Sequence, residues 1–230
     1  MDWLLDFYNW RIVSQYTGQF ATGLANTLIA AGASLVLSVL AGIPLALAHM
    51  SPRAAVWRPV AAYVQFIRST PLLVQIYLVY YAVPMLVPGA KGWSEMLLGI
   101  IAMTLHHAAY MSEIIRVGIE SVPRGQIEGA KACGMNYRQR LRYVVLPQAF
   151  ANTLPPLLGQ TAVLIKDTSL LSLITVFELV AAGVQMNSDR IVPNESFLTI
   201  AAGYLLIYAC MLLLSRGVSI WLAGPAWNAR

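Results

Sequence analysis

The chain has 230 residues, of which 58% are hydrophobic and only 11% are charged. A typical soluble domain carries roughly 25% charged residues, so this chain has too few polar side chains to cover a water-soluble globule. The composition therefore excludes a soluble globular domain and indicates an integral membrane protein. The formal net charge of +5 favours positively charged cytoplasmic loops over a nucleic-acid partner, because such loops are rich in Lys and Arg.

Five apolar segments are long enough to cross a bilayer, which requires about 20 mainly apolar residues. They cover residues of about 22–49, 59–87, 94–119, 148–182 and 196–221. No internal repeat, low-complexity tract or long linker divides the chain. Residues 1–230 are therefore predicted to form one all-α domain, an integral membrane bundle of five transmembrane helices.

Lys and Arg are concentrated in the loops on one side of the predicted bundle, and cytoplasmic loops are the ones that carry such an excess. The rich side has Arg53, Arg58, Arg68, Arg116, Arg124, Lys131, Arg138, Arg140 and Arg142. The opposite side has Arg11, Lys91 and Arg190. This asymmetry predicts a cytoplasmic loop over residues 120–147, an external N-terminus and a cytoplasmic C-terminus.

The predicted cytoplasmic loop is too long for a plain turn and has the signals of a short helix. Pro123 ends the preceding helix, because proline lacks a backbone donor and disfavours helix at the residue before it. Residues 126–133 are good helix formers, and Gly134 is expected to stop the helix. Two interpretations remain open from composition: a low-profile surface helix that another protein approaches, or a solvated loop on lipid headgroups.

The spacing of this loop resembles the signature of ABC importer permeases, which reads EAA, three residues, G, nine residues, I-x-L-P. Residues 128–130 read EGA, three residues lead to Gly134, and nine more lead to VVLP at 144–147. Gly129 replaces an alanine, which weakens a helix by roughly 1 kcal/mol. The resemblance implies that the following residues couple the chain to an ATPase: Glu128, Gly129, Ala130, Gly134, Leu146 and Pro147.

Three further blocks resemble the permeases of the polar amino acid uptake family, the histidine-, glutamine- and glutamate-type permeases. They are FIRSTPLLVQIYLVYY at 66–81, AAYMSEIIRVGIESVPRGQ at 108–126 and KDTSLLSLI at 166–174. The resemblance implies a type I ABC importer permease in a bacterial cytoplasmic (inner) membrane. It also implies a second copy or sister permease, a cytoplasmic ATPase dimer and an external, periplasmic amino-acid-binding protein as partners.

The chain itself is expected to be catalytically inert. It contains no GxxxxGK[ST] phosphate-binding loop, so ATP and Mg are expected to be used by the partner ATPase, with no cofactor in this chain. No catalytic residue and no metal site are predicted. The pair His106-His107 lacks the further ligands that a metal needs, and neutral hydrogen bonding beside Tyr110 is the favoured interpretation.

Ionisable residues at membrane depth are candidates for function, because an isolated charge there is costly. Asp167 is a candidate ligand for a substrate ammonium or guanidinium group, with a structural ion pair as the open alternative. Glu113 and Arg116 stand three residues apart and are interpreted as a structural pair on one helix face. The candidate substrate-pathway residues are Asp167, Thr168, Ser169, Lys166, His107, Tyr110 and Arg68. For Arg68 an anchor at the cytoplasmic headgroups is the favoured alternative, because it stands near the start of its predicted span.

Two other classes compete with an ATP-driven importer for an amino acid or close derivative. An ion-gradient-driven secondary transporter or channel subunit is the first, although such proteins often contain internal repeats. A membrane-embedded enzyme is the second, and it would need a convergent nucleophile, acid–base or metal set. The sequence favours the importer over both.

Overall fold

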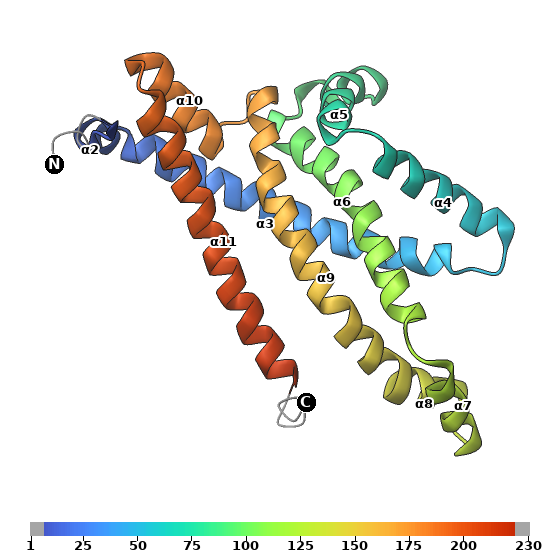
Figure 1. Ribbon diagram of the computed structural model, residues 1–230. Helices are drawn as coiled ribbons and strands as arrows, with labels where there is room; N and C mark the ends of the chain where they lie inside the picture. The colour runs from blue at the N-terminus through green and yellow to red at the C-terminus, as the bar shows by residue number, and fades with distance from the viewer. Residues whose placement is uncertain (1–6, 224–230) are drawn as a thin grey trace. The chain divides into compact units, whose positions relative to one another are not determined.

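The computed structural model describes residues 7–223, and no β-strand occurs within them. Successive helices follow one another with short connections (Figure 1). In chain order they are α2 (Trp10–Val13), η1 (Ser14–Tyr16), α3 (Thr17–His49), α4 (Ala54–Ser69), α5 (Leu72–Leu86), η2 (Ala90–Gly92), α6 (Glu95–Glu120), α7 (Arg124–Ala132), α8 (Tyr137–Arg140), the π-helical η3 (Leu141–Val145), α9 (Leu146–Asp167), η4 (Thr168–Ile174), α10 (Leu179–Arg190) and α11 (Pro193–Ala223).

Four continuous helical stretches of the described chain are long and apolar enough to cross a membrane. They are Trp10–His49, Glu95–Glu120, Tyr137–Ile174 and Pro193–Gly217. A fifth span is present when the bent pair α4 and α5 is counted as one. The predicted all-α membrane fold is therefore confirmed, and α6 lies within one residue of its predicted bounds of 94–119.

The predicted second span, 59–87, is corrected by the structure. The helix begins earlier, at Ala54, and breaks between Ser69 and Leu72. Thr70 adopts an extended backbone with φ −118° and ψ 144°, the conformation that a following proline imposes. Its hydroxyl donates to the Phe66 carbonyl at 3.0 Å, which satisfies an acceptor that the broken helix leaves open. The apolar run is continuous in sequence, but Pro71 divides it into two helices.

The predicted fourth span, 148–182, is also corrected. The α-helix α9 ends at Asp167, and the 3-10 helix η4 continues only to Ile174. Thr175 has a left-handed backbone with φ 65°, which ends the helix. Glu178 then starts α10 as its N-cap, so residues 179–182 belong to a separate element. Hydropathy alone does not register this break.

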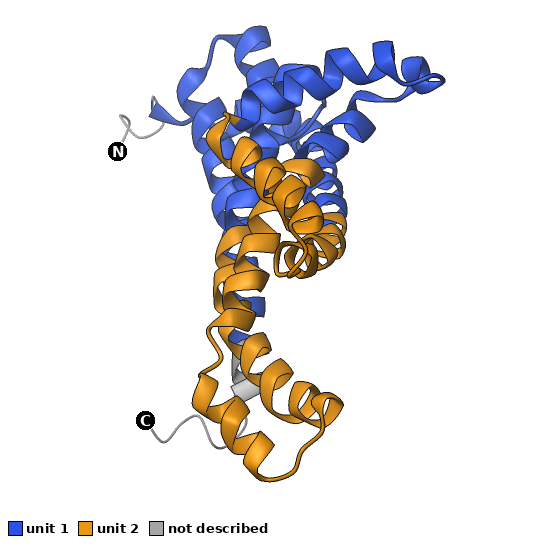
Figure 2. Cartoon of the chain, turned by 90° about the vertical axis from the view of Figure 1, so that its right-hand side faces the viewer, with its two compact units in different colours: residues 1–34, 72–103, 162–230 blue, residues 35–71, 104–161 orange. Residues whose placement is uncertain are grey.

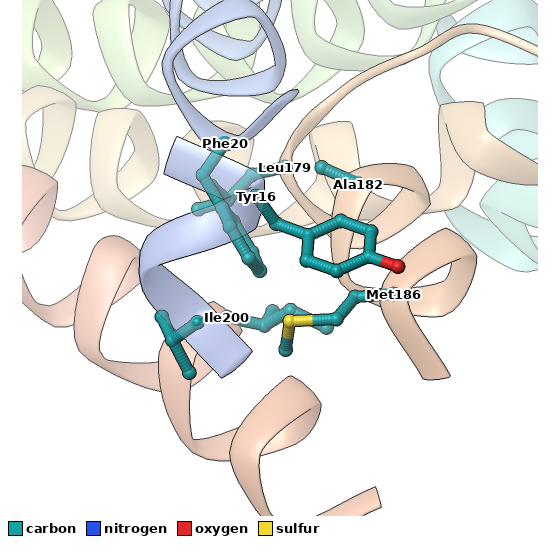
Figure 3. Packing of buried hydrophobic residues seen from close by; sticks show 7 residues of the cluster. Tyr16, Phe20, Leu179, Ala182, Met186 and Ile200 are labelled. Atoms are coloured by element: carbon teal, nitrogen blue, oxygen red, sulfur yellow. The ribbon is translucent and has the colours of Figure 1, made fainter. Parts of the chain in front are cut away.

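The chain divides into two compact units, shown in blue and orange in Figure 2. Unit 1 comprises residues 1–34, 72–103 and 162–230, and its core cluster includes Tyr16, Phe20, Leu179, Ala182, Met186 and Ile200 (Figure 3). In this unit α10 packs closely on α11, because a Cβ at Gly203 would lie 2.7 Å from the Leu179 side chain. Glycine therefore permits a close helix crossing here.

Unit 2 comprises residues 35–71 and 104–161. Val64 and Ile67 of α4 form a buried cluster with Ala109 of α6. A Cβ at Gly118 of α6 would overlap the hydroxyl of Thr153 on α9, so these two helices approach each other at van der Waals distance. The segment 120–147 belongs to this unit.

Candidate functional site

The segment 120–147 is mostly helical, with breaks at 121–123 and 133–136, as its local signals predict. Pro123 is the N-cap of α7, with an extended backbone at φ −59° and ψ 132°. Gly134 has φ 77°, and the backbone N–H of Met135 donates to the carbonyl of Ala130 at 3.1 Å. Asn136 and Gln139 then form a reciprocal capping box that begins α8. The predicted limits of the short helix, Pro123 and Gly134, are confirmed.

Five of the six predicted coupling residues are exposed on this segment, and we call them the coupling surface: Glu128, Gly129, Gly134, Leu146 and Pro147. Leu146 exposes 49% of its surface although it is apolar. Ala130, the sixth predicted residue, is buried, with an exposed fraction of 8%. Gly129 faces open space within this chain, because a Cβ added there would have no atom within 4 Å.

Alanine substitution of two glycines in this segment is expected to have opposite effects. Gly129→Ala should stabilise α7 by about 1 kcal/mol, because the added methyl meets no neighbour and alanine favours helix. Gly134→Ala should destabilise it by about 1 kcal/mol or more, because φ at this position is 77°. Amide hydrogen exchange of residues 124–132 in the purified full-length permease, without the ATPase, measures both. Equal protection in the two variants would contradict this account of the helix.

A compact ion-pair cluster occupies the end of α6 that precedes the coupling surface. Arg116 donates two hydrogen bonds to Glu113, at 3.1 and 2.6 Å, and one to Glu120 at 2.6 Å. His49 Nδ1 of α3 lies 3.9 Å from Glu113 Oε2. The predicted Glu113–Arg116 pair is therefore confirmed. Because Arg116 engages both carboxylates, its charge is balanced within the protein.

Beside this cluster, unit 2 contains an open cleft of about 560 Å³ between α6 and α9. Its lining is mostly apolar, and Asn152 Nδ2 donates to the Ser121 hydroxyl at 2.9 Å across it. The cleft is lined by Glu113, Ile114, Val117, Gly118, Ser121, Asn152 and Pro156.

Unit 2 also holds three of the predicted pathway residues, and it brings two of them together. The exposed Arg68 guanidinium lies 5.6 Å from the Tyr110 ring centroid, within range of a cation–π contact. His107 is fully buried, with its Nδ1 3.1 Å from Nε2 of Gln160 on α9. Within residues 7–223, no group of three or more His, Cys, Asp or Glu side chains is arranged to hold a metal ion.

Unit 1 holds the other four predicted pathway residues, at the junction of α9 and η4. Lys166 is exposed, Asp167 and Ser169 are half-buried, and Thr168 is fully buried. The Thr168 hydroxyl donates to the Ile165 carbonyl at 2.7 Å and lies 3.4 Å from the Tyr204 hydroxyl. The predicted pathway residues therefore fall into two sets, one in each unit.

Sequence reasoning missed the roles of Glu178, Tyr204 and Gln160. Each is a polar side chain in an apolar stretch, and a buried Tyr hydroxyl, amide or carboxyl needs a partner. Tyr204 donates to Glu178 Oε2 at 2.9 Å, and Gln160 contacts His107. Each of these polar residues stands out in an apolar stretch of the sequence. The sequence does not identify their partners, because Tyr204 lies 26 positions from Glu178 and Gln160 lies 53 positions from His107.

The buried Glu178 predicts a pH-dependent stability. It lies outside the membrane-spanning segments, and burial raises the pKa of its carboxyl above the ordinary 4.5 although neighbouring groups donate hydrogen bonds to it. The folded protein then holds the proton more tightly than the unfolded chain does. This group therefore stabilises the fold below about pH 4.5 and loses that stabilisation as the pH rises through its raised pKa.

We expect the melting temperature of the wild-type complex, relative to Glu178→Gln, to fall as the pH is raised from about 5 to about 8. The glutamine variant is the reference because its side chain does not titrate. Thermal unfolding of both complexes across this range measures the difference. A wild-type protein that gains stability over Glu178→Gln with rising pH would contradict the assignment.

Comparison with known proteins connects this architecture to a family. The family described as "Binding-protein-dependent transport system inner membrane component" matches residues 34–223. The chain is 38% identical over 229 residues to the nopaline transport system permease protein NocM of Agrobacterium fabrum, across 96% of this chain and 94% of the relative. It is 37% identical over 182 residues to the L-cystine transport system permease protein TcyB of Bacillus subtilis, across 77% and 76% of the two chains.

A solved structure described as an amino acid ABC transporter with histidines has the same fold. It superposes with a TM-score of 0.83 at 31% identity, covering 90% of this chain and 95% of the other. These relatives support an ATP-driven importer over the ion-gradient-driven transporter, the channel and the enzyme. The chain therefore belongs to the inner-membrane components of binding-protein-dependent transport systems, and it is the permease subunit of an ABC importer whose ATPase is a separate subunit.

Proposed function

We propose that this permease carries a polar amino acid or an amino-acid derivative into the cell and forms the translocation pathway for it. Relatives named for nopaline and L-cystine transport support this substrate class. The amino acid ABC transporter with histidines, 31% identical over nearly the whole chain, supports it further. The main observation behind the proposal is that 96% of this chain aligns with an importer permease.

The substrate contacts are proposed at the junction of α9 and η4. Asp167 is half-buried at the C-terminal end of α9, where its carboxylate is suited to a substrate ammonium or guanidinium group. Lys166, Thr168 and Ser169 complete this set. Arg68, Tyr110 and His107 are proposed to line the pathway in unit 2, with the Arg68–Tyr110 contact holding the guanidinium over the ring.

The coupling surface is proposed to dock on a cytoplasmic ATPase dimer, which uses ATP and Mg. The exposed Glu128 and the low-profile Gly129 support this role, because a helix with small side chains allows a partner to approach closely. A second permease copy or a sister permease completes the pathway, and an external amino-acid-binding protein delivers the substrate. In this arrangement the coupling surface and the C-terminus lie in the cytoplasm and the N-terminus lies outside.

A reconstitution experiment tests the proposal. The permease is assembled with its ATPase and its binding protein, and the binding protein is first screened against the amino acids by thermal shift. The amino acid that stabilises it should then be taken up by proteoliposomes, and it should stimulate ATP hydrolysis. Asp167→Asn should lower uptake, with Glu95→Gln as the control on an exposed carboxylate. Uptake that needs no amino-acid ligand would contradict the substrate class.

A further inference from the structure

Glu178 caps α10 from a position that has no contact with solvent. Its side chain is fully buried, with an exposed fraction of 0%. Oε2 accepts the backbone N–H of Val180 and Oε1 accepts that of Ala181, each at 2.9 Å. These bonds satisfy two donors that the first turn of a helix leaves open. The carboxyl is thus held at the start of α10 by the helix itself.

The backbone around Glu178 is fixed against α3. Asn26 Nδ2 donates to the Phe177 carbonyl at 2.7 Å, and the Leu179 N–H donates to Thr27 Oγ1 at 3.1 Å. A Cβ at Gly23 would lie 2.9 Å from the Glu178 carbonyl oxygen, which is closer than real Cβ contacts allow. The segment 177–179 therefore sits directly on the α3 backbone, and Glu178 cannot shift without breaking these contacts.

Two hydroxyl groups, those of Tyr204 and Thr168, connect the Glu178 carboxyl to η4. The Tyr204 hydroxyl of α11 donates to Glu178 Oε2 at 2.9 Å and lies 3.4 Å from Thr168 Oγ1. Thr168 is itself fully buried, and it shares its one hydroxyl proton between the Ile165 carbonyl in the last turn of α9, at 2.7 Å, and the Tyr204 oxygen. Tyr204 thus connects the anchored carboxyl to the residue that directly follows Asp167.

We propose that Glu178 is a positioning residue for transport, which acts through Tyr204 to hold Thr168 and the start of η4 in place beside Asp167. The inference rests on the proposed pathway role of Asp167 and Thr168. A shift of about 1 Å in a substrate-binding group is enough to change its effect strongly. Glu178 itself needs no contact with the substrate, because it acts at the far end of the hydroxyl chain.

Three conservative variants separate this link from the capping role of Glu178. Glu178→Asp retains a carboxylate suited to an N-cap, but its shorter side chain withdraws from Tyr204. Tyr204→Phe removes only the connecting hydroxyl. Thr168→Val removes the hydroxyl at the other end while keeping the side-chain shape. Tyr208→Phe is the matched control, one turn further along α11 at a side chain that is 37% exposed.

The measurement is the number of amino-acid molecules transported per ATP hydrolysed by the complete complex in proteoliposomes. Each of the three variants should lower this ratio about fivefold, the factor that one hydrogen bond of typical net strength represents. The double variant Glu178→Asp/Tyr204→Phe should fall no further than either single variant, because both break the same link. Tyr208→Phe should keep the wild-type ratio.

A purely structural role would lower the yield and melting temperature of the complex and leave this ratio unchanged, which would overturn the inference. Additive losses in the double variant would overturn it as well. A wild-type complex that transports while Thr168→Val keeps the full ratio would refute the link and leave the proposed function standing. A wild-type complex with no ATP-dependent uptake would refute the proposed function, and the inference would fall with it.

Discussion

Charge reversal at Glu128 is expected to lower transport strongly while the permease still folds. Glu128 is exposed on α7, so Glu128→Lys removes no internal contact of the permease that the structure shows. At the proposed interface with the ATPase it would place a positive charge where a carboxylate is expected to be paired. Truncating or reversing one member of an interface charge pair costs several kcal/mol, so ATP-driven uptake should fall at least about tenfold.

Two measurements separate lost docking from lost folding. Co-purification of the ATPase with the permease should fall together with uptake, whereas the melting temperature of the permease should be unchanged. Lys91→Glu is the control, a charge reversal at an exposed residue in the short connection between α5 and α6. Full uptake and full stimulation of ATP hydrolysis in Glu128→Lys would show that α7 is not the docking helix.

Adding a single methyl group at Gly118 is expected to disrupt the packing of α6 on α9. The Cβ of Gly118→Ala would overlap the Thr153 hydroxyl, with the Thr153 Cβ at 3.0 Å and its Cα at 3.3 Å. Backbone and a buried side chain cannot move aside as a flexible side-chain end does. Overpacking of this kind costs about 1–3 kcal/mol, and here it also displaces the wall of the cleft that Gly118 lines.

The same substitution on the facing helix provides a control. Gly159 lies inside α9, and no atom lies within 4 Å of a Cβ added there. Gly159→Ala should therefore keep or slightly raise the melting temperature, since alanine favours helix in both places. Gly118→Ala should lower the melting temperature, and Gly118→Ala/Thr153→Ala should recover part of the loss. Equal effects of the two single variants would refute the close approach at Gly118.

Features encoded by neighbouring residues were predictable from the sequence. The bounds of α6 follow from an apolar run between Ser94 and the Ser121-Val122-Pro123 break, and the structure places the helix at Glu95–Glu120. The limits of α7 follow from Pro123 and Gly134, whose backbone preferences act locally. The Glu113–Arg116 pair follows from helical spacing alone.

Features that depend on distant partners were not predictable in this way. The hydropathy of the sequence stays high across Pro71 and across residues 175–182. Hydropathy measures composition, and it carries no information on where a helix ends or changes direction. The predicted fourth span therefore continues past the residue that begins a new helix, Glu178. Thr27 and Asn26 of α3 bond the backbone on either side of this residue, and Tyr204 of α11 donates to its carboxyl. These contacts with α3 and α11 are visible only after the helices have been brought together.

The central claim is that this permease imports an amino acid at the expense of ATP hydrolysed by a partner. The most direct test is uptake of the binding protein's own amino acid by proteoliposomes that contain the complete complex, with ionophores present to collapse every ion gradient. Uptake is expected to require both ATP on the ATPase side and the loaded binding protein on the other side. Uptake that proceeds without ATP and stops when the gradients are collapsed would contradict the claim.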